Sequence, residues 1–498
     1  MLSSMNPNEP RRASPQAAPR ESLEDAAASA QPVVAAPPTV VVDEPLDAKG
    51  LRSVIVASSV GTLFEWYDFY LYGSLAVFFS DLFFPPGNER ATLLASLATF
   101  GAGFAVRPLG ALVFGRIGDL VGRKYTFLVT IVTMGLATAL IGLLPSYATA
   151  GMAAPVALVS LRLVQGLALG GEYGGAATYV AEHVPDGRRG WYTSFIQTTA
   201  TLGIFLSLGV IGATRVACGE QAFREWGWRI PFLVSFVLLG LSLWIRLWMR
   251  ESPLFTKLKR EGRVARNPLK ESFSNPLNLR YVLLALFGAT AGQGVVWYTG
   301  QFYALTFLQK TLGLSWQLAY GIVAGALLLG TPLFLVFGAW SDRIGRKRVM
   351  LGGMAAAALT YLPIYRAMTA LGNPDLAGSV TELPAANVVG LVLLIFMQMV
   401  WVAMVYGPIA AFLVELFPTS IRYTSMSLPY HLGNGWFGGF LPLVATALTT
   451  SPWVQERLGA DAAYAGLVYP IAICAMSLLI GWRLLPETRE KRIDRAEH

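Results

Sequence analysis

Two carboxylates interrupt an otherwise apolar stretch of this chain. The segment Gly61–Gly73 reads GTLFEWYDFYLYG and contains Glu65 and Asp68, three residues apart. On a helix this spacing places both side chains on one face. Two acids this close on a buried face cannot both ionise without a large cost, so one of them is expected to hold a proton. Such a carboxyl can load and release a proton within a membrane.

Three further ionisable residues fall within apolar segments of the first 250 residues, namely Arg107, Arg162 and Glu172. At a rise of about 1.5 Å per residue, Arg107 and Glu172 lie nearer one end of their segments, and Arg162 lies deeper. We therefore expect one cluster of Arg107 with Glu172, and another of Arg162 with the two acids. A buried guanidinium matches a carboxylate, so either arginine is a candidate clamp for an anionic substrate. The alternative is that each only neutralises an internal acid.

Polar and aromatic residues take the place of charges in the second half of the chain. The segments GQGVVWYTGQFYAL and SLPYHLGNGWFGG begin at Gly292 and Ser427. We expect Tyr298, Gln301 and Asn434 to line a binding cavity, because such groups orient a ligand without adding charge. The alternative is that they hold helices together. His431 is either a proton relay or a structural histidine.

The composition predicts a helical membrane protein that crosses the bilayer many times. Hydrophobic residues make up 54% of the chain and charged residues 14%, where a soluble protein carries roughly 25% charge. The apolar segments are about 20 residues long and do not alternate, so helices are favoured over a barrel. The net charge of +8 arises from Lys and Arg in short loops, which is typical of cytoplasmic loops and not of nucleic-acid binding. Cys218 and Cys474 lie in different regions, so no disulfide, metal site or cofactor is expected.

Twelve apolar spans can be delineated, and the positive loops place both termini in the cytoplasm. The organisation is a disordered tail (1–50), a first six-helix bundle (51–250), a basic linker (251–280), a second bundle (281–486) and a short tail (487–498). The spans lie at about 52–80, 92–115, 124–145, 152–181, 191–213, 230–249, 281–308, 317–339, 348–369, 387–412, 424–448 and 464–485.

The two halves repeat short motifs in the same order. GRIGDLVGRK (Gly115–Lys124) is echoed by GAWSDRIGRK (Gly338–Lys347), and EHVPDGRR (Glu182–Arg189) by ELFPTSIR (Glu415–Arg422). Duplicate halves imply a pseudo-twofold axis along the membrane normal, with a binding site near the midplane between them.

These motifs resemble the signature of the major facilitator superfamily. The second copy matches fully, and the first departs at Leu120, where a basic residue is usual. GTLFEWYDFYLYG, RPLGALVFGRIGD, RLVQGLALGGEYGGA and GWRIPF are similar to blocks of its metabolite:proton symporter family. The resemblance implies two pseudo-symmetric six-helix bundles and carriage of organic acids, zwitterionic osmolytes or amino acids. It also implies that ion pairs lock the halves together, formed by Asp119, Arg123, Glu172, Glu182, Arg189, Asp342, Arg346, Glu415 and Arg422.

The expected function is cotransport of a proton with a small mono- or dicarboxylic acid across a bacterial inner membrane, by alternating access. The alternatives are a symporter or uniporter for a zwitterion such as betaine or proline, and a membrane sensor of metabolites. An enzyme is not expected, because the spans hold no clustered His, Ser or metal ligands. The expected partners are the substrate, the proton and the lipid bilayer, with no nucleic acid, and the protein is expected to be a monomer.

Overall fold

The structure is a computed structural model, and it describes residues 48–491 apart from 122, 172, 186, 249–267 and 418–420. Within the helices, the side chains of 48–54, 57, 58, 115–127, 179, 182, 183, 245–248, 268 and 269 also lie outside the description. The predicted tail at 1–50 and linker at 251–280 therefore fall largely outside the described residues.

The described chain is built from helices that follow the predicted spans. The first half comprises α2 (Ala48–Phe83), α3 (Glu89–Ala105), α4 (Arg107–Val121), α5 (Arg123–Ile141), α6 (Tyr147–Ala150), α7 (Ala153–Gly170), α8 (Tyr173–His183), α9 (Arg189–Cys218), α10 (Glu220–Ala222), η1 (Phe223–Gly227) and α11 (Arg229–Trp248).

The described second half begins at Pro268, so part of the stretch 251–280 predicted as a linker is helical. It comprises α13 (Pro268–Ser274), α14 (Pro276–Ala285), η2 (Leu286–Thr290), α15 (Ala291–Tyr298), η3 (Thr299–Tyr303), α16 (Ala304–Thr306), η4 (Phe307–Thr311), α17 (Trp316–Gly330), α18 (Leu333–Ile344), α19 (Arg346–Gly372), α20 (Ala385–Tyr406), α21 (Ile409–Leu416), α22 (Arg422–Leu432), η5 (Gly433–Gly438), α23 (Leu441–Thr449), α24 (Pro452–Leu458), η6 (Gly459–Leu467) and α25 (Val468–Leu484).

Helix length and apolar composition are those of a membrane protein. In the part of the chain that is described, seven helices are long and apolar enough to cross a bilayer, and an eighth is if the bent pair Glu220–Gly227 and Arg229–Trp244 forms one span. Each predicted span coincides with one helix or with consecutive helical elements. The fold class, an all-α membrane protein, is as expected.

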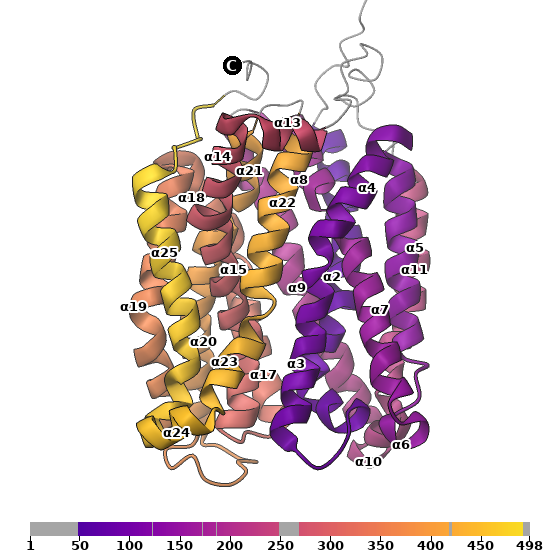
Figure 1. Cartoon of the computed structure of the whole chain (residues 1–498), viewed down its shortest axis with the longest axis vertical. Helices are drawn as coiled ribbons and strands as arrows, with labels where there is room; N and C mark the ends of the chain where they lie inside the picture. Colours follow the sequence, from indigo (N-terminus) through magenta and orange to yellow (C-terminus); the bar gives the residue numbers. More distant parts are fainter. Residues whose placement is uncertain are drawn as a thin grey trace, which may run out of the picture. The chain divides into compact units, whose positions relative to one another are not determined.

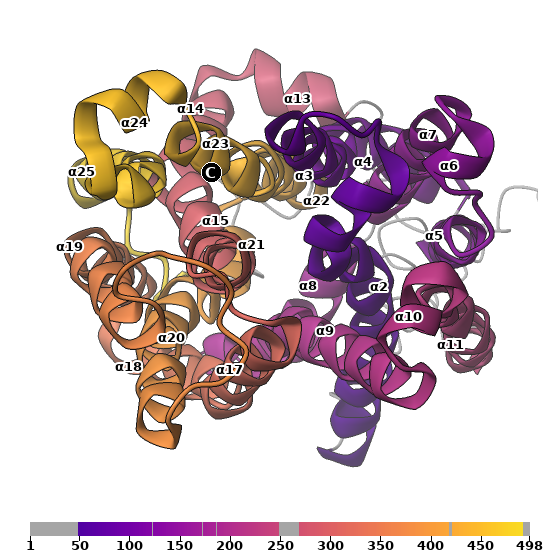
Figure 2. The same ribbon diagram turned by 90° about the horizontal axis from the view of Figure 1, so that it is seen from below.

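The helices stand side by side in two groups. Those from α2 to α11 form one group and those from α14 to α25 the other, with α13 across one end (Figure 1). Seen along the helices, the two groups meet where α9 lies against α17 and α18 and where α3 and α4 lie against α23 and α22 (Figure 2). The end at α13, which carries the repeated motif loops, is called the motif face below. The opposite end, at α24, is called the vestibule face, after a cavity that is described in the next subsection.

Several spans are broken where the local sequence cannot continue a regular helix. Proline at 332 separates α17 from α18, and proline at 408 separates α20 from α21, because proline lacks the amide hydrogen that the helix needs. Between Leu286 and Thr311 the helix contains three π-helical turns. Such turns are frequent at functional sites. This segment carries the candidate residues Tyr298 and Gln301 into the interface between the groups.

Candidate functional site

A small closed cavity lies between the two groups of helices. Its volume is about 10 Å³, which is room for at most one water molecule. It unites an acid, a guanidinium, an imidazole and two phenols within one apolar interior. Its lining comprises Thr62, Glu65, Trp66, Arg107, Leu169, Tyr173, Ala176, Ile196, Tyr430 and His431.

Arg107 brings a buried cation to this cavity. It is the first residue of α4, next to the break after α3, and only 1% of it is exposed. Its guanidinium carbon lies 4.0 Å from the ring centre of Phe104, 4.3 Å from that of Phe69 and 5.3 Å from that of Trp66. The Nε and Nη2 atoms are buried and have no hydrogen-bond partner among the described residues. Arg107 is therefore held by aromatic faces, and these two donors are available to a ligand.

The two acids of α2 occupy different surroundings. Glu65 lines the cavity with Arg107. Asp68 does not, and it accepts a hydrogen bond of 2.5 Å from the Ser235 hydroxyl of α11. Residues three apart on a helix differ by about 60° in direction, which is enough to turn one side chain to the cavity and the other to a neighbouring helix. The expectation that both acids act at one place is thus corrected.

Arg162 forms hydrogen bonds within the interior of the first half. Its Nη1 donates to the Phe69 carbonyl at 3.1 Å and to Gln165 Oε1 at 2.9 Å, and its Nη2 donates to the Phe100 carbonyl at 3.4 Å. It forms no ion pair with either acid of α2 within the described part of the chain. The predicted cluster of Arg162 with those acids is therefore wrong, because backbone carbonyls take its hydrogen bonds. The other predicted cluster cannot be compared, since Glu172 lies outside the described residues.

The second-half candidates divide into one structural residue and two that remain candidates. Asn434 exchanges two hydrogen bonds with Gln293, at 2.9 and 3.0 Å, and so joins η5 to α15. Gln301 is 1% exposed, and neither of its amide atoms has a partner among the described residues. The Tyr298 ring meets that of Phe104 edge-on at 5.1 Å, directly beside Arg107. Asn434 thus fits the packing alternative, whereas Gln301 has free donors and acceptors.

His431 lies in the cavity wall on α22. It is 1% exposed, and both of its ring nitrogens lack a partner in the described structure. Tyr430, its neighbour, stacks on Tyr173 with ring centres 3.5 Å apart and planes 3° from parallel. This stack closes the cavity between α8 of the first half and α22 of the second.

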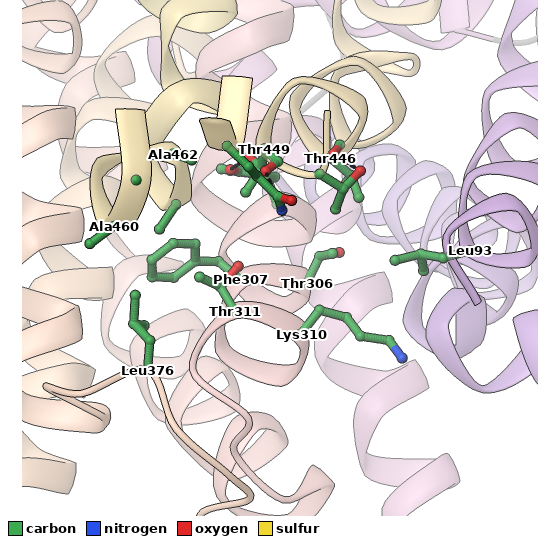
Figure 3. A pocket seen from close by; sticks show the side chains of 15 residues that line it. Leu93, Thr306, Phe307, Lys310, Thr311, Leu376, Thr446, Thr449, Ala460 and Ala462 are labelled. Carbon is green, nitrogen blue, oxygen red and sulfur yellow. Dashed lines mark hydrogen bonds between the residues drawn. The ribbon is translucent and has the colours of Figure 1, made fainter. Parts of the chain in front are cut away.

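A second and larger cavity opens at the vestibule face, and is called the vestibule here. Its volume is about 440 Å³. Leu93 of α3 lies on one side of it, and η4, α23 and η6 form the rest of the wall (Figure 3). The lining comprises Leu93, Tyr303, Thr306, Phe307, Lys310, Thr311, Leu376, Thr446, Thr449, Thr450, Gln455, Gly459, Ala460, Ala462 and Ala463.

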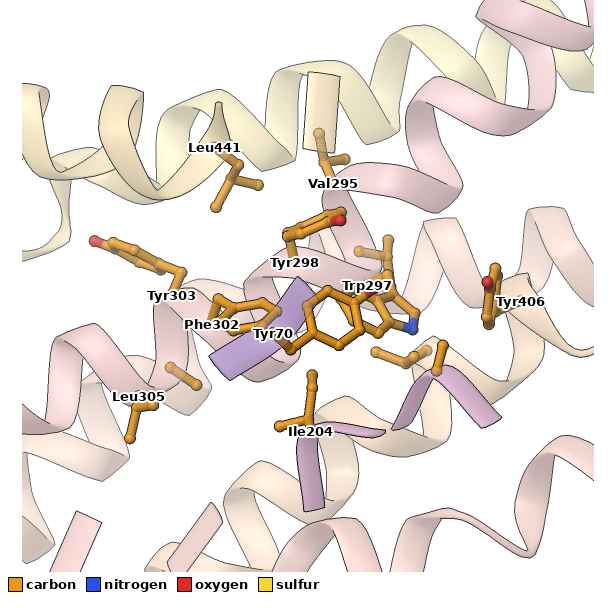
Figure 4. Packing of buried hydrophobic residues seen from close by; sticks show 14 of the residues in the cluster. Tyr70, Ile204, Val295, Trp297, Tyr298, Phe302, Tyr303, Leu305, Tyr406 and Leu441 are labelled. Carbon is orange, nitrogen blue, oxygen red and sulfur yellow. The ribbon is translucent and has the colours of Figure 1, made fainter. Parts of the chain in front are cut away.

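Four aromatic residues, called the aromatic layer, separate the two cavities. They are Tyr70 and Phe100 of the first half and Trp297 and Phe302 of the second, and Figure 4 shows Tyr70, Trp297 and Phe302 together. Ring centres are 5.3 Å apart for Tyr70 and Trp297, 5.1 Å for Tyr70 and Phe302, and 5.0 Å for Phe100 and Phe302. Tyr70 also stacks at 4.9 Å on Trp66, which lines the small cavity. The layer therefore shuts the small cavity off from the vestibule.

Four charged residues, called the charge cluster, join the halves at the motif face. Arg189 of α9 contacts Glu415 of α21 at 3.2 Å, and Arg346 of α19 contacts the same carboxylate at 3.1 Å. Arg346 also pairs with Asp342 at 2.6 Å. The side chains of Arg346 and Glu415 are fully buried. Burial makes this connection expensive to break, because one partner would leave charge uncompensated.

Asp342 also caps α9. Its two carboxylate oxygens accept hydrogen bonds of 2.9 Å from the amides of Gly190 and Trp191. An acid at a helix N-terminus is stabilised by the free amides and the helix dipole. Asp342, which ends α18 of the second half, is thus tied to the first turn of α9 in the first half.

Other predicted gate residues are only partly described. Arg422 is buried, and its Nε donates to the Phe417 carbonyl at 3.1 Å. The side chains of Asp119, Arg123 and Glu182 lie outside the described residues, so their predicted ion pairs remain predictions.

Sequence reasoning did not single out Glu487 and Thr488. Glu487 accepts hydrogen bonds from the amides of Arg346 and Lys347, which begin α19. The Thr488 hydroxyl donates to Glu415 at 2.8 Å. Their only signal was the loose match of LPET with RESP of the first half. Trp66 and Tyr173, which line the small cavity, carried no spacing signal at all.

Comparison with known proteins identifies the class. The model of the family described as "Sugar (and other) transporter" matches residues 53–279 and 256–498. The chain therefore belongs to this family, within the major facilitator superfamily, and it is a membrane transporter and not an enzyme. The resemblance inferred from its motifs is confirmed.

Three relatives illustrate the range of named transporters. The chain is 34% identical to the inner membrane metabolite transport protein YhjE of Escherichia coli, over 89% of this chain and 96% of the relative. It is 34% identical to the α-ketoglutarate permease of the same organism, over 88% and 95%. It is 33% identical to the proline/betaine transporter of Salmonella typhimurium, over 82% and 79%.

A solved structure agrees on the fold. The proton:xylose symporter XylE of E. coli, bound to 6-bromo-6-deoxy-D-glucose, superposes with a TM-score of 0.69 at 17% identity. The match covers 90% of this chain and 98% of that one. At this identity the likeness establishes the major facilitator fold.

Proposed function

We propose that this transporter moves a small organic acid together with a proton, with Arg107 binding the carboxylate and Glu65 carrying the proton. One observation supports it above all: Glu65 lines the same small cavity as Arg107, whose Nε and Nη2 atoms are buried without a partner in the described structure. A guanidinium with free donors fits a carboxylate. In this proposal Asp68, which is hydrogen-bonded to Ser235, does not take part in proton coupling.

Charge balance supplies the coupling. With Glu65 ionised, the pair Glu65 and Arg107 is neutral, and an incoming carboxylate adds one negative charge. Because the cavity is buried within the membrane-spanning helices, that excess charge is costly. A proton on Glu65 restores neutrality, so substrate and proton are expected to bind together. His431 is placed to pass the proton, since both its ring nitrogens are unpartnered among the described residues.

The cavity as it stands holds no substrate, because its volume of about 10 Å³ is far smaller than an organic acid. We infer that it opens alternately, through the aromatic layer on one side and through the Tyr173–Tyr430 stack and charge cluster on the other. From the basic loops we infer that the motif face and both termini lie in the cytoplasm. The naming of YhjE favours the inner membrane, and we propose that the transporter works as a monomer.

A zwitterion is the second candidate substrate. The rings of Trp66, Tyr173 and Tyr430 line the cavity, and aromatic faces bind quaternary ammonium groups. A relative at 33% identity is named a proline/betaine transporter. In this alternative Arg107 would still bind the carboxylate, and the rings would hold the cationic end.

The test is uptake by the purified full-length protein in proteoliposomes, with and without an inward proton gradient. The panel comprises α-ketoglutarate, other dicarboxylates, cyclic and aromatic acids, betaine and proline. We expect an acid to accumulate only with the gradient, and Glu65→Gln to abolish accumulation while exchange of internal for external substrate persists. Asp68→Asn, three residues away but outside the cavity, is the matched control and should still accumulate substrate.

Three outcomes would overturn the proposal. Uptake restricted to proline or betaine would replace the acid by the zwitterion. Normal accumulation by Glu65→Gln would remove Glu65 from coupling. Absence of uptake across the panel, with the protein folded in the vesicles, would favour a sensor.

A further inference from the structure

The vestibule has the dimensions of a ligand site. Its volume of about 440 Å³ falls within the range of roughly 300–1,000 Å³ that small-molecule pockets occupy. It is far larger than the cavity at Arg107. Its wall contains residues of both halves, with Leu93 from α3 facing the second-half residues (Figure 3).

The vestibule wall is positively charged. Lys310 is the one charged residue among those that line it. Asp461 is a chain neighbour of the wall, but it pairs with Arg366 at 3.2 Å. A second cation, Arg90, donates from Nε to the hydroxyl of Thr450 in the wall at 3.1 Å. The lining therefore presents one cation, with a second beside it, and no carboxylate, which favours an anionic ligand.

Threonine hydroxyls also line this wall, and those of Thr306, Thr449 and Thr450 already donate to carbonyls one turn earlier in their helices. Five threonines line the vestibule, at 306, 311, 446, 449 and 450. Thr446 is 5% exposed, and its hydroxyl has no hydrogen-bond partner among the described residues. Thr449 is within 3.4 Å of the Tyr303 hydroxyl. A buried hydroxyl without a partner is unfavourable, and a ligand oxygen would satisfy it.

The vestibule lies directly outside the aromatic layer. Thr306 and Lys310 follow Phe302 by one and two turns of the same helical segment. Phe302 in turn packs on Tyr70, which stacks on Trp66 of the small cavity. A solute that leaves the vestibule inwards therefore meets the aromatic layer and then Arg107.

We propose that the vestibule is a first binding site for the carboxylate substrate, where the Lys310 ammonium group and the Thr446 hydroxyl hold it before the aromatic layer opens. This inference rests on the proposed function and adds a second site to it. Because Lys310 is exposed, the site is weak and salt-sensitive. Its role is to raise the local concentration of anionic substrate on one side of the membrane.

The test measures initial uptake rates in right-side-out and everted membrane vesicles that contain the full-length protein. The probe is the acid that accumulates fastest in the panel above. We expect Lys310→Gln to raise KM about threefold at low ionic strength, in one vesicle orientation only, with the maximal rate unchanged. At about 0.5 M salt the difference should vanish. Lys310→Arg should restore KM, and Thr446→Val should raise it without the salt dependence.

The control is Arg457→Gln, which removes a positive charge from α24 at the same face but outside the vestibule lining. An equal rise in KM with Arg457→Gln, or an unchanged KM with Lys310→Gln, would overturn the vestibule site. In that case a normal proton-driven uptake of the acid would leave the proposed function intact. Uptake of zwitterions alone would overturn both.

Discussion

At the scale of single residues, Arg107 and Arg162, two of the buried arginines of the first half, have different surroundings. Arg162 donates to the carbonyls of Phe69 and Phe100 and to Gln165, so its hydrogen bonds are used within the protein. Arg107 rests on aromatic rings and keeps two donors free of partners in the described structure. Substitution of a residue that stabilises the fold is expected to lower thermal stability, whereas substitution of a residue that binds substrate is expected to lower substrate binding.

We predict that Arg107→Gln abolishes substrate binding and leaves thermal stability unchanged or higher, because it removes a buried charge that forms no ion pair with a described residue. Arg162→Gln should instead lower stability by about 3 kcal/mol, since it strands buried carbonyls that a charged donor had satisfied. The measurements are substrate counterflow and the thermal midpoint of the purified protein. A stable, inactive Arg162→Gln protein beside an active Arg107→Gln protein would reverse the assignment.

At the scale of elements, α9 and α18 cross through two glycines. A Cβ placed on Gly190 would lie 2.5 Å from the Gly338 carbonyl, and one on Gly338 would lie 2.6 Å from the Gly190 carbonyl. Small residues permit such close helix approach in membranes. The approach also brings the first turn of α9 within reach of Asp342. Closure at the motif face therefore depends on glycine at both positions.

We predict that Gly190→Ala favours opening at the motif face. The reporter is a cysteine at Thr178, which is 2% exposed where α8 meets Met426 of α22, in a protein with the half-exposed Cys218 replaced by serine. The rate of its alkylation should rise at least tenfold. Gly209→Ala, on the same helix with nothing within 4 Å of the new methyl group, should leave the rate unchanged. Equal rates in the two alanine variants would argue against the crossing as a determinant of closure.

The elements were largely predictable from the sequence, but their contacts were not. Hydropathy and the positive loops located the spans because a bilayer imposes both patterns. Hydropathy and loop charge do not predict which way a side chain points within a packed interior. For this reason the sequence predicted that Glu65 and Asp68 act together, whereas Asp68 accepts a hydrogen bond from Ser235. For the same reason Asn434 was predicted to line the cavity, whereas its side chain is hydrogen-bonded to Gln293. The vestibule around Lys310 arises from segments far apart in the chain and left no local pattern.

At the scale of the whole molecule, the small cavity is shut on both sides. The aromatic layer closes it towards the vestibule, and the charge cluster with the Tyr173–Tyr430 stack closes it towards the motif face. The two closures differ in kind. The aromatic layer consists of many short-ranged ring contacts, whereas the ion pairs of the charge cluster all involve the carboxylates of Glu415 and Asp342. Glu415 accepts from Arg189, Arg346 and Thr488, and so joins both halves to the C-terminal segment.

We therefore predict that Glu415→Gln shifts the protein towards the state open at the motif face. Loss of the charge removes the carboxylate that the buried guanidinium groups of Arg189 and Arg346 share across the halves, which costs the closed state about 3 kcal/mol, or a population change of roughly 100-fold. Alkylation of the Thr178→Cys reporter should accelerate accordingly, and net uptake should fall while exchange continues. Asp461→Asn breaks the exposed pair with Arg366 and should change neither, because exposed ion pairs contribute little. An unchanged reporter in Glu415→Gln would mean that the aromatic stack, and not the charge cluster, holds this side closed.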